Sequence, residues 1–118
     1  MGLDFFIERK RKGKPYESNT WEEVVYGRNC YKVREIILQN ISTYDQDTCE
    51  AKLTIGTLND LIGKLAEYIS SRNLNNEYIF CDDNYIKALD FLSQLAKVVY
   101  DHYFDYENDY EYRLINSF

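Results

Sequence analysis

The segment at residues 100–112 brings together acidic and aromatic side chains of the kinds that binding surfaces use. It holds five of the twelve tyrosines and five acidic residues. Exposed tyrosines beside carboxylates offer rigid, amphipathic contact area. A row of carboxylates also imitates a phosphate backbone and fits the basic groove of a nucleic-acid enzyme. The binding residues predicted from this pattern are Asp105, Tyr106, Glu107, Asp109, Tyr110, Glu111 and Tyr112.

The same alternation of residue types also suits a hairpin at the edge of a sheet. Residues 103–112 contain two aromatic, β-prone arms on either side of Asn108-Asp109, a pair that favours a turn. In that arrangement the acids point outward and the tyrosines lie half-buried over the helices. Both interpretations of the segment stay open from the sequence.

The single histidine and the three cysteines restrict the metal and catalytic chemistry of the chain. A lone His102 excludes zinc motifs with two histidines, and Cys30, Cys49 and Cys81 form no Cys-x-x-Cys pair. A nucleophilic thiol needs a lowered pKa, whereas the acids at residues 82–83 would raise the pKa of the neighbouring Cys81. We therefore expect no catalytic, cofactor-binding or metal-binding residues, and small buried cysteines in a reducing cytoplasm.

Two pairs of adjacent carboxylates, Glu22-Glu23 and Asp82-Asp83, do not change this expectation. General acid–base catalysis needs two carboxyl groups that converge in a cleft with separated pKa values, but neighbours in sequence usually point apart. We interpret both pairs as solvated or helix-capping residues. The five glycines are scattered, so the sequence has no glycine-rich phosphate loop. The sequence therefore predicts a protein that is not an enzyme.

Basic residues are concentrated near the start of the chain, with five of them in residues 9–14. The rest of the chain holds nine basic and twenty acidic residues, a balance of −11. Because Gly13 and Pro15 break regular structure, we interpret residues 9–15 as a solvated loop. Weak contact with phosphate is the alternative, but the acidic remainder argues against direct nucleic-acid binding.

Length and composition favour a single domain. The chain has 118 residues, a net charge of −6 and 45% hydrophobic residues, which is typical of a globular protein with one core. Apolar runs such as residues 36–38 are far too short to span a membrane. Because the N-terminus does not read as a secretory signal, we expect a cytoplasmic protein. We take residues 1–118 as one domain with a basic loop at residues 9–15 and an acidic-aromatic segment at residues 101–118.

Hydrophobic periodicity predicts the first half of the secondary structure. Alternation of apolar and polar residues predicts strands at residues 2–8 and 51–55. Between them, apolar residues recur every three or four positions, which predicts a helix over residues 24–41. The apolar face of this predicted helix consists of Tyr26, Cys30, Val33, Ile37 and Ile41.

Two more amphipathic helices follow in the sequence. Thr57 and Asp60 resemble a capping box in front of an apolar stripe formed by Leu58, Leu61, Ile62, Leu65 and Ile69. Gly63 within this helix admits close packing against a neighbour. The last helix is expected at residues 84–100, with one face made of Tyr85, Leu89, Leu92, Ala96 and Val99.

The end of the chain completes the predicted fold. Leu114-Ile115 and Phe118 are expected to pair beside the N-terminal strand. Three helices with two or three strands predict an α+β fold, in which three amphipathic helices pack on a small antiparallel sheet or hairpin.

The opening Met1-Gly2-Leu3-Asp4, followed by aromatic residues, resembles the start of a group of small phage and prophage proteins. That group carries a Tyr-x-Arg-Lys/Asn segment, which Tyr26-Gly27-Arg28-Asn29 matches except that glycine replaces an aromatic residue. A strand and a Leu-rich helix follow in the same order, at residues 53–55 and 58–69. An acidic, aromatic tail ends at residues 116–118 without the usual final tryptophan. The group has no established activity, so the resemblance implies a phage or prophage origin and no mechanism.

These observations favour a small, non-catalytic protein that binds another macromolecule, with a protein as the expected partner. In a phage context, the acids of residues 105–111 would act as surrogate phosphates that block a host nucleic-acid enzyme, with Tyr106, Tyr110 and Tyr112 as anchors. The alternative is a structural module that forms a homodimer through its aromatic tail. An enzyme is the third hypothesis, and it requires His102, a cysteine and a carboxylate to meet in one pocket.

Overall fold

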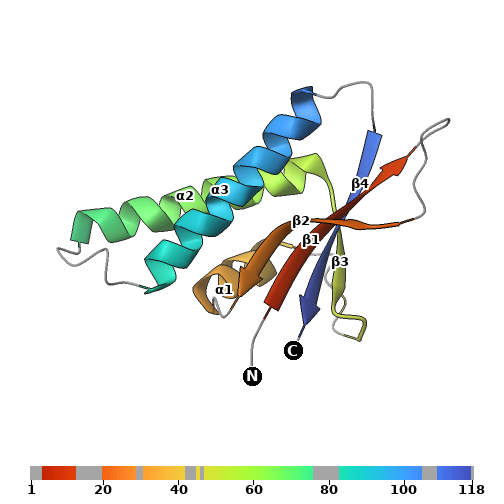
Figure 1. Cartoon of the computed structure of the whole chain (residues 1–118). Helices are drawn as coiled ribbons and strands as arrows, with labels where there is room; N and C mark the ends of the chain where they lie inside the picture. The colour runs from red at the N-terminus through yellow and green to blue at the C-terminus, as the bar shows by residue number, and fades with distance from the viewer. Residues whose placement is uncertain are drawn as a thin grey trace.

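The computed structural model describes residues 4–12, 20–28, 31–41, 45, 47–75, 83–104 and 109–117. In this part of the chain, three helices pack on a four-stranded antiparallel sheet (Figure 1). This arrangement confirms the predicted α+β class. The strands are β1 (Asp4–Lys12), β2 (Glu22–Arg28), β3 (Glu50–Leu53) and β4 (Asp109–Ser117). The helices are α1 (Tyr31–Asn40), α2 (Ile55–Asn75) and α3 (Asp83–Phe104).

The first and last strands of the chain are neighbours in the middle of the sheet, whose order is β2-β1-β4-β3. Phe6 lies opposite Ile115 and Ile7 lies opposite Leu114. This register confirms the predicted pairing of the C-terminal residues with the N-terminal strand, while Phe118 lies outside the described residues. The first residue of β1 therefore lies beside the last residue of β4, with Asp4 opposite Ser117 at one end of the sheet (Figure 1).

One face of the sheet forms the floor of the core. Successive side chains of a strand point to opposite faces, so Phe5 and Ile7 of β1 share a face with Tyr112 and Leu114 of β4, and all four are buried. The helices supply the other side of the core. In α2 the predicted stripe is confirmed, since Ile62 is partly buried and the stripe's other members, Leu58, Leu61, Leu65 and Ile69, are buried.

The start of α2 differs from the predicted capping box. The Thr57 backbone N–H donates a hydrogen bond to Thr54 Oγ1 over 3.2 Å, and the helix begins at Ile55. Thr54 is therefore the N-cap residue, and the assignment of the cap to Thr57 and Asp60 is wrong by one turn. The expected close packing at Gly63 is also wrong, because a Cβ at this position would meet no atom within 4 Å.

The helix predicted over residues 24–41 is in fact a strand followed by a shorter helix. Glu22–Arg28 forms β2, and α1 begins at Tyr31. Val24, Val25 and Tyr26 have the β-branched and aromatic side chains that strands favour, but their apolar spacing also continues the pattern of the helix. Tertiary packing explains why residue 27 is a glycine, since a Cβ there would lie 3.0 Å from Phe91 Cδ2 on α3.

α3 binds the outer edge of β2 through one side chain. The Tyr26 backbone N–H donates to Gln94 Oε1 over 2.9 Å, and Gln94 Nε2 donates to the Tyr26 carbonyl over 2.8 Å. The amide of Gln94 thus replaces a neighbouring strand at this residue and satisfies backbone groups that an edge strand leaves unpaired.

The predicted third helix exists, but its buried face is rotated from the prediction. The buried residues of α3 are Tyr85, Ala88, Phe91, Leu95 and Val98, with Leu92 and Val99 packed partly against them. Leu89 and Ala96, which were assigned to the core, are exposed. Apolar residues occupy two sides of this helix, so its periodicity alone did not decide which side faces the core.

Two predictions about irregular structure are wrong. Residues 9–12 do not belong to a loop, because β1 continues to Lys12 and pairs with β4 over its whole length. The hairpin proposed for residues 103–112 is replaced by the end of α3 and the start of β4, and β4 lies inside the sheet rather than at its edge. Residues 13–15 and 105–108 lie outside the described residues.

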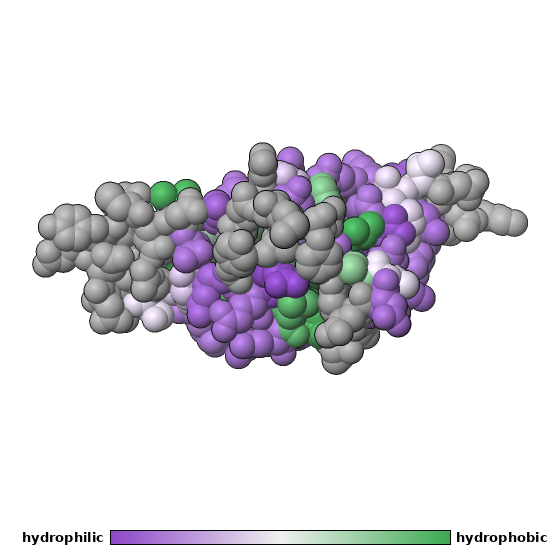
Figure 2. Space-filling model, turned by 90° about the horizontal axis from the view of Figure 1, so that it is seen from below, coloured by the Kyte–Doolittle hydropathy of each residue, from purple (hydrophilic) through white to green (hydrophobic). Residues whose placement is uncertain are grey.

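The remaining sequence predictions concern cysteines and membranes. Cys49 is only partly buried, and its backbone adopts a positive φ of 57°, whereas Cys30 and Cys81 lie outside the described residues. In the described part of the chain, no helix combines the length and apolar character needed to cross a bilayer. Figure 2 shows the molecule from below: among the residues coloured there, most are hydrophilic, and the hydrophobic ones form small, separate patches.

Candidate functional site

The second half of β1 brings cations onto the same face of the sheet as the core. Arg9 and Arg11 continue the alternation of Phe5 and Ile7, so they share the helix-side face. In the register with β4, Arg9 lies opposite Tyr112 and Arg11 lies opposite Tyr110. The antiparallel pairing therefore places basic side chains beside the tyrosines of the acidic-aromatic segment.

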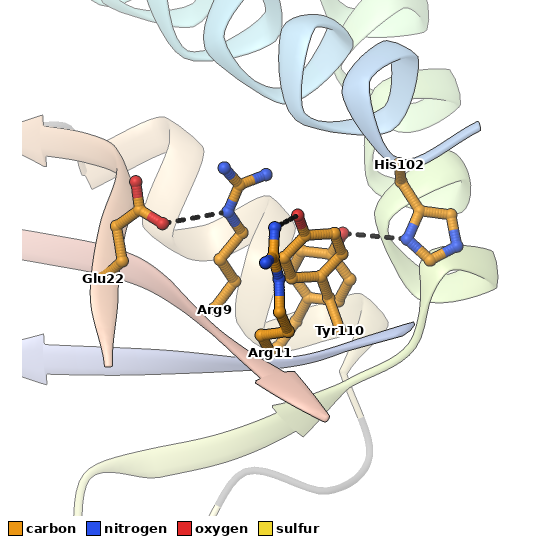
Figure 3. A network of polar contacts seen from close by, with 6 residues as sticks. Arg9, Arg11, Glu22, His102 and Tyr110 are labelled. Atoms are coloured by element: carbon orange, nitrogen blue, oxygen red, sulfur yellow. Dashed lines mark hydrogen bonds and ion pairs between the residues drawn. The ribbon is translucent and has the colours of Figure 1, made fainter. Parts of the chain in front are cut away.

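Both guanidinium groups lie against a single aromatic ring (Figure 3). The Cζ atoms of Arg9 and Arg11 are 4.6 Å and 5.8 Å from the centroid of the Tyr110 ring. Arg11 also donates from Nη2 to the Tyr110 hydroxyl over 3.3 Å. A cation over an aromatic ring contributes about 0.5–2 kcal/mol, depending on its exposure. The ring therefore holds two like charges in fixed positions near each other.

One of the two guanidinium groups has a carboxylate partner. Arg9 Nε donates to Glu22 Oε2 of β2 over 3.3 Å (Figure 3). The side chain of Glu22 is 66% exposed, so this ion pair contributes little to stability. Among the described residues, this Nε contact is the only polar side-chain bond of Arg9, which leaves the Nη donors available for a ligand.

His102 connects the end of α3 to the buried tyrosine of β4. His102 Nδ1 and the Tyr112 hydroxyl are 2.9 Å apart (Figure 3), with the donor set by the histidine tautomer. Tyr112 is only 2% exposed, so its hydroxyl needs such a partner. This contact gives His102 a structural role at the helix C-terminus, where histidine is also favoured by the helix dipole.

A pocket of about 420 Å³ adjoins this network between β3, β4 and the start of α2. Its polar lining includes Lys12, Lys52, His102, Tyr110 and Glu111. Two lysines against one carboxylate give the pocket a cationic lining, and Tyr110 belongs both to the pocket and to the arginine cluster. We use the name basic end for the surface formed by Arg9, Arg11, Lys12, Lys52 and Tyr110.

On the opposite face of the sheet, β1 and β4 carry charges that are paired across the strands. Arg113 Nε donates to Glu8 Oε1 over 2.9 Å, and Arg113 Nη2 lies 2.8 Å from the same oxygen. Lys10 Nζ lies 3.8 Å from Glu111 Oε2. Trp21 covers this ladder, with Arg113 Cζ 4.1 Å and Lys10 Nζ 5.1 Å from its ring centroid. Glu111 thus has a lysine of the neighbouring strand as its ion-pair partner.

Of the seven predicted binding residues, Tyr110, Glu111 and Tyr112 line the same pocket. Tyr110 and Tyr112 point to the helix-side face, half-buried and buried respectively, whereas Glu111 points to the other face. Asp109 begins β4 opposite Lys12. The predicted residues Asp105, Tyr106 and Glu107 lie outside the described residues.

Sequence reasoning missed Arg9 and Arg11 as parts of the site. The residues of the Arg11–Tyr110 contact are 99 positions apart in the sequence. A signal was present, because the basic run lengthens a predicted strand and residues 109–112 alternate with the same period of two. Matching these two alternations would have suggested a cross-strand pairing of basic with acidic and aromatic residues.

In the described part of the chain, this pocket does not bring together the three groups that the enzyme hypothesis requires. His102 and Glu111 line the same pocket, but the residues that line it include no cysteine. In the same part of the chain, no three histidine, cysteine, aspartate or glutamate side chains are grouped so that they could hold a metal ion. Comparisons with protein-family models, with curated proteins and with solved structures found no match for this chain.

Proposed function

We propose that this protein is a small, non-catalytic binding module that takes an acidic segment of a protein partner at its basic end. The observation that carries this proposal is the pair of guanidinium groups held against the Tyr110 ring. Arginine binds a carboxylate through two parallel hydrogen bonds, with a geometry that lysine does not offer. Because the ring already orders both side chains, less conformational entropy is lost when a ligand binds.

The neighbouring pocket supports an extended ligand rather than a single ion. Lys12 and Lys52 line it on one side of Tyr110, and the two arginines lie on the ring itself. A peptide with several carboxylates would reach both groups. In this assignment Tyr110 remains a binding residue of the acidic-aromatic segment, but it acts together with cations of β1.

The charge of the whole molecule favours a short acidic segment over a nucleic acid. Outside residues 9–14 the chain carries a balance of −11, which repels a long polyanion beyond the few residues that touch the basic end. A short peptide contacts only the cationic surface. Of the acids that were expected to mimic phosphate, Glu111 lies beside Lys10, whereas Asp105 and Glu107 lie outside the described residues. A phage or prophage origin and a cytoplasmic location are parts of the same proposal, and they rest on the sequence.

The proposal is tested by fluorescence anisotropy with a labelled peptide that alternates glutamate and serine. The double variant Arg9→Gln/Arg11→Gln is expected to weaken binding by about tenfold or more. A charge-assisted hydrogen bond contributes about 1.5–3 kcal/mol, so the loss of one such bond already has this effect. The matched control Lys32→Gln/Lys64→Gln removes two charges from exposed ion pairs elsewhere and is expected to change the affinity less than about twofold.

Two results would contradict the proposal. If both double variants bind the acidic peptide equally well, the contact is non-specific attraction. A single-stranded oligonucleotide of the same formal charge is the second probe. If it binds more tightly than the peptide, and the arginine variant loses that binding, the basic end is a phosphate site and the assignment to an acidic protein segment is wrong.

A further inference from the structure

α3 carries a second apolar stripe on the side that faces away from the core. Four large side chains in this stripe are exposed: Ile86 by 46%, Leu89 by 39%, Tyr100 by 65% and Tyr103 by 61%. Large apolar side chains gathered on one exposed helix face mark interaction sites, whereas single scattered ones do not. This stripe is separate from the basic end.

The spacing of the stripe follows a heptad pattern. Ile86, Ser93 and Tyr100 are seven residues apart, and so are the second set, Leu89, Ala96 and Tyr103. Each member of the second set follows a member of the first by three residues, which is the spacing of the two apolar positions in a coiled-coil seam. All six lie within α3. The outer side of this helix therefore has the pattern of a helix that pairs with another helix.

The two ends of the stripe complement each other. The first end is aliphatic, with Ile86 and Leu89, and the second is aromatic, with Tyr100 and Tyr103. An antiparallel copy of α3 places Ile86 against Tyr103 and Leu89 against Tyr100. It also places the small residues of the centre, Ser93 and Ala96, against each other, so that the helices approach closely there. All three of these contacts occur in the same register of the two helices, as a two-fold axis requires.

The charges beside the stripe fit the same antiparallel pairing. Asp90 and Lys97 are two helical turns apart, so they lie on the same flank of the stripe, and both are exposed. Across an antiparallel seam, residues of the same flank meet. Asp90 of one copy would therefore lie near Lys97 of the second copy, and the symmetry repeats this ion pair. In a parallel pair of helices, Asp90 and Lys97 would each lie beside the other flank of the second copy and would not meet.

We propose that the outer stripe of α3 binds a second copy of this chain in an antiparallel, two-fold arrangement centred between Ser93 and Ala96. The proposal goes beyond the binding of an acidic segment and uses other residues. Self-complementarity of the residue pattern and of the charges selects a second copy over an unrelated protein as the occupant. The seam is short, with fewer than three heptads, so the dimer is expected to dissociate on dilution.

The test is a charge swap followed by sedimentation velocity over a dilution series. Asp90→Lys alone and Lys97→Asp alone each place like charges opposite each other twice, and each is expected to weaken the dimer by about tenfold. An equal mixture of the two variants restores opposite charges at both contacts, so dimers are expected to return. The matched controls Glu67→Lys and Lys64→Glu reverse charges of an exposed pair on α2 and are expected to leave dimerisation unchanged.

The mixture of the two charge variants distinguishes a specific contact between two copies from a general effect of charge or of impaired folding. If the wild-type chain stays monomeric throughout the series, or if the mixture dimerises no better than each variant alone, a second copy is not the occupant of the stripe. Circular dichroism of each variant shows whether α3 is intact. Because none of these substitutions touches Arg9, Arg11 or Tyr110, the acidic-peptide assay is expected to be unaffected by them.

Discussion

The two halves of β1 present the same face of one strand to different surroundings. Phe5 and Ile7 are almost completely buried in the core. Two and four residues further on, Arg9 and Arg11 point to the same face, but they lie on the ring of Tyr110 and stay partly exposed. β1 and β4 remain paired through both halves, so the difference lies in what covers the strands and not in the sheet itself.

This difference separates the residues that stabilise the fold from those that are available for binding. Burial of apolar area stabilises the first half without any directional bond. In the second half, the contacts are cation–aromatic pairs and exposed ion pairs. Each of these contributes about 1 kcal/mol or less to stability at a solvent-exposed site. The second half can therefore exchange its contacts with a ligand while the first half holds the sheet together. The predictions below test this division.

The largest effect is expected in the buried half. Ile7→Ala removes a completely buried side chain and is expected to lower the free energy of unfolding by about 2–5 kcal/mol, through lost apolar burial and the remaining cavity. Urea denaturation measures this change. Arg9→Ala on the same face is the control, and a loss of similar size in that variant would contradict the division of β1 into two halves.

The packing around two glycines predicts opposite effects on stability when each is replaced by alanine. A Cβ at Gly27 would lie 3.0 Å and 3.2 Å from two ring carbons of Phe91, so Gly27→Ala is expected to destabilise the fold by about 1–3 kcal/mol. A Cβ at Gly63 meets no atom within 4 Å, so Gly63→Ala is expected to stabilise α2 by up to about 1 kcal/mol. Thermal unfolding followed by circular dichroism distinguishes the two, and equal shifts in one direction would refute the packing argument.

Tyr112 lies at the border between the two halves and should show an intermediate effect. Tyr112→Phe keeps the buried ring but removes the hydroxyl that contacts His102, so it is expected to lower the free energy of unfolding by about 0.5–1.5 kcal/mol. Urea denaturation of Tyr112→Phe, of His102→Ala and of the double variant checks whether the two substitutions act through the same contact. A double variant as destabilised as the sum of both singles would show that they do not.

The smallest effect on stability is expected at the basic end. Arg11→Gln is expected to change the free energy of unfolding by less than about 1 kcal/mol, because it removes one partly exposed cation–aromatic contact. In the anisotropy assay with the acidic peptide, the same variant is expected to weaken binding clearly. A variant that loses stability but not affinity would assign Arg11 to the fold instead of the binding surface.

Local patterns in the sequence predicted those elements whose apolar residues occupy one side only. The stripe of α2 has no competing stripe, so its buried face followed directly from a spacing of three and four residues. The alternation in residues 51–55 likewise predicted β3 to within two residues. In contrast, Val24 and Val25 fit both a strand and a helix, and only the pairing of β2 with β1 decided between the two.

The candidate site was predicted only in part, because its contacts join distant segments. Tyr110 was selected from the acidic-aromatic pattern, but its neighbours Arg9 and Arg11 were assigned to a separate loop. A run of like charges usually indicates a solvated segment. The alternation that matches this run to residues 109–112 becomes visible only when two segments 99 positions apart are compared. The exposed stripe of α3 was missed for a related reason, since Leu89 and Ala96 were combined with core residues into one apolar face.

By itself, the sequence determined the class of fold, the amphipathic character of α2 and α3, and the concentration of basic and acidic residues at opposite ends of the chain. These properties depend on residue type and on spacing within a few turns. The tertiary structure alone decided the register that carries the pairing of β1 with β4 as far as Lys12, so that Arg9 and Arg11 meet Tyr110. It also decided which side of α3 is buried. Cross-strand register and helix rotation depend on the burial of the whole core at once, so no segment contains enough information to set them.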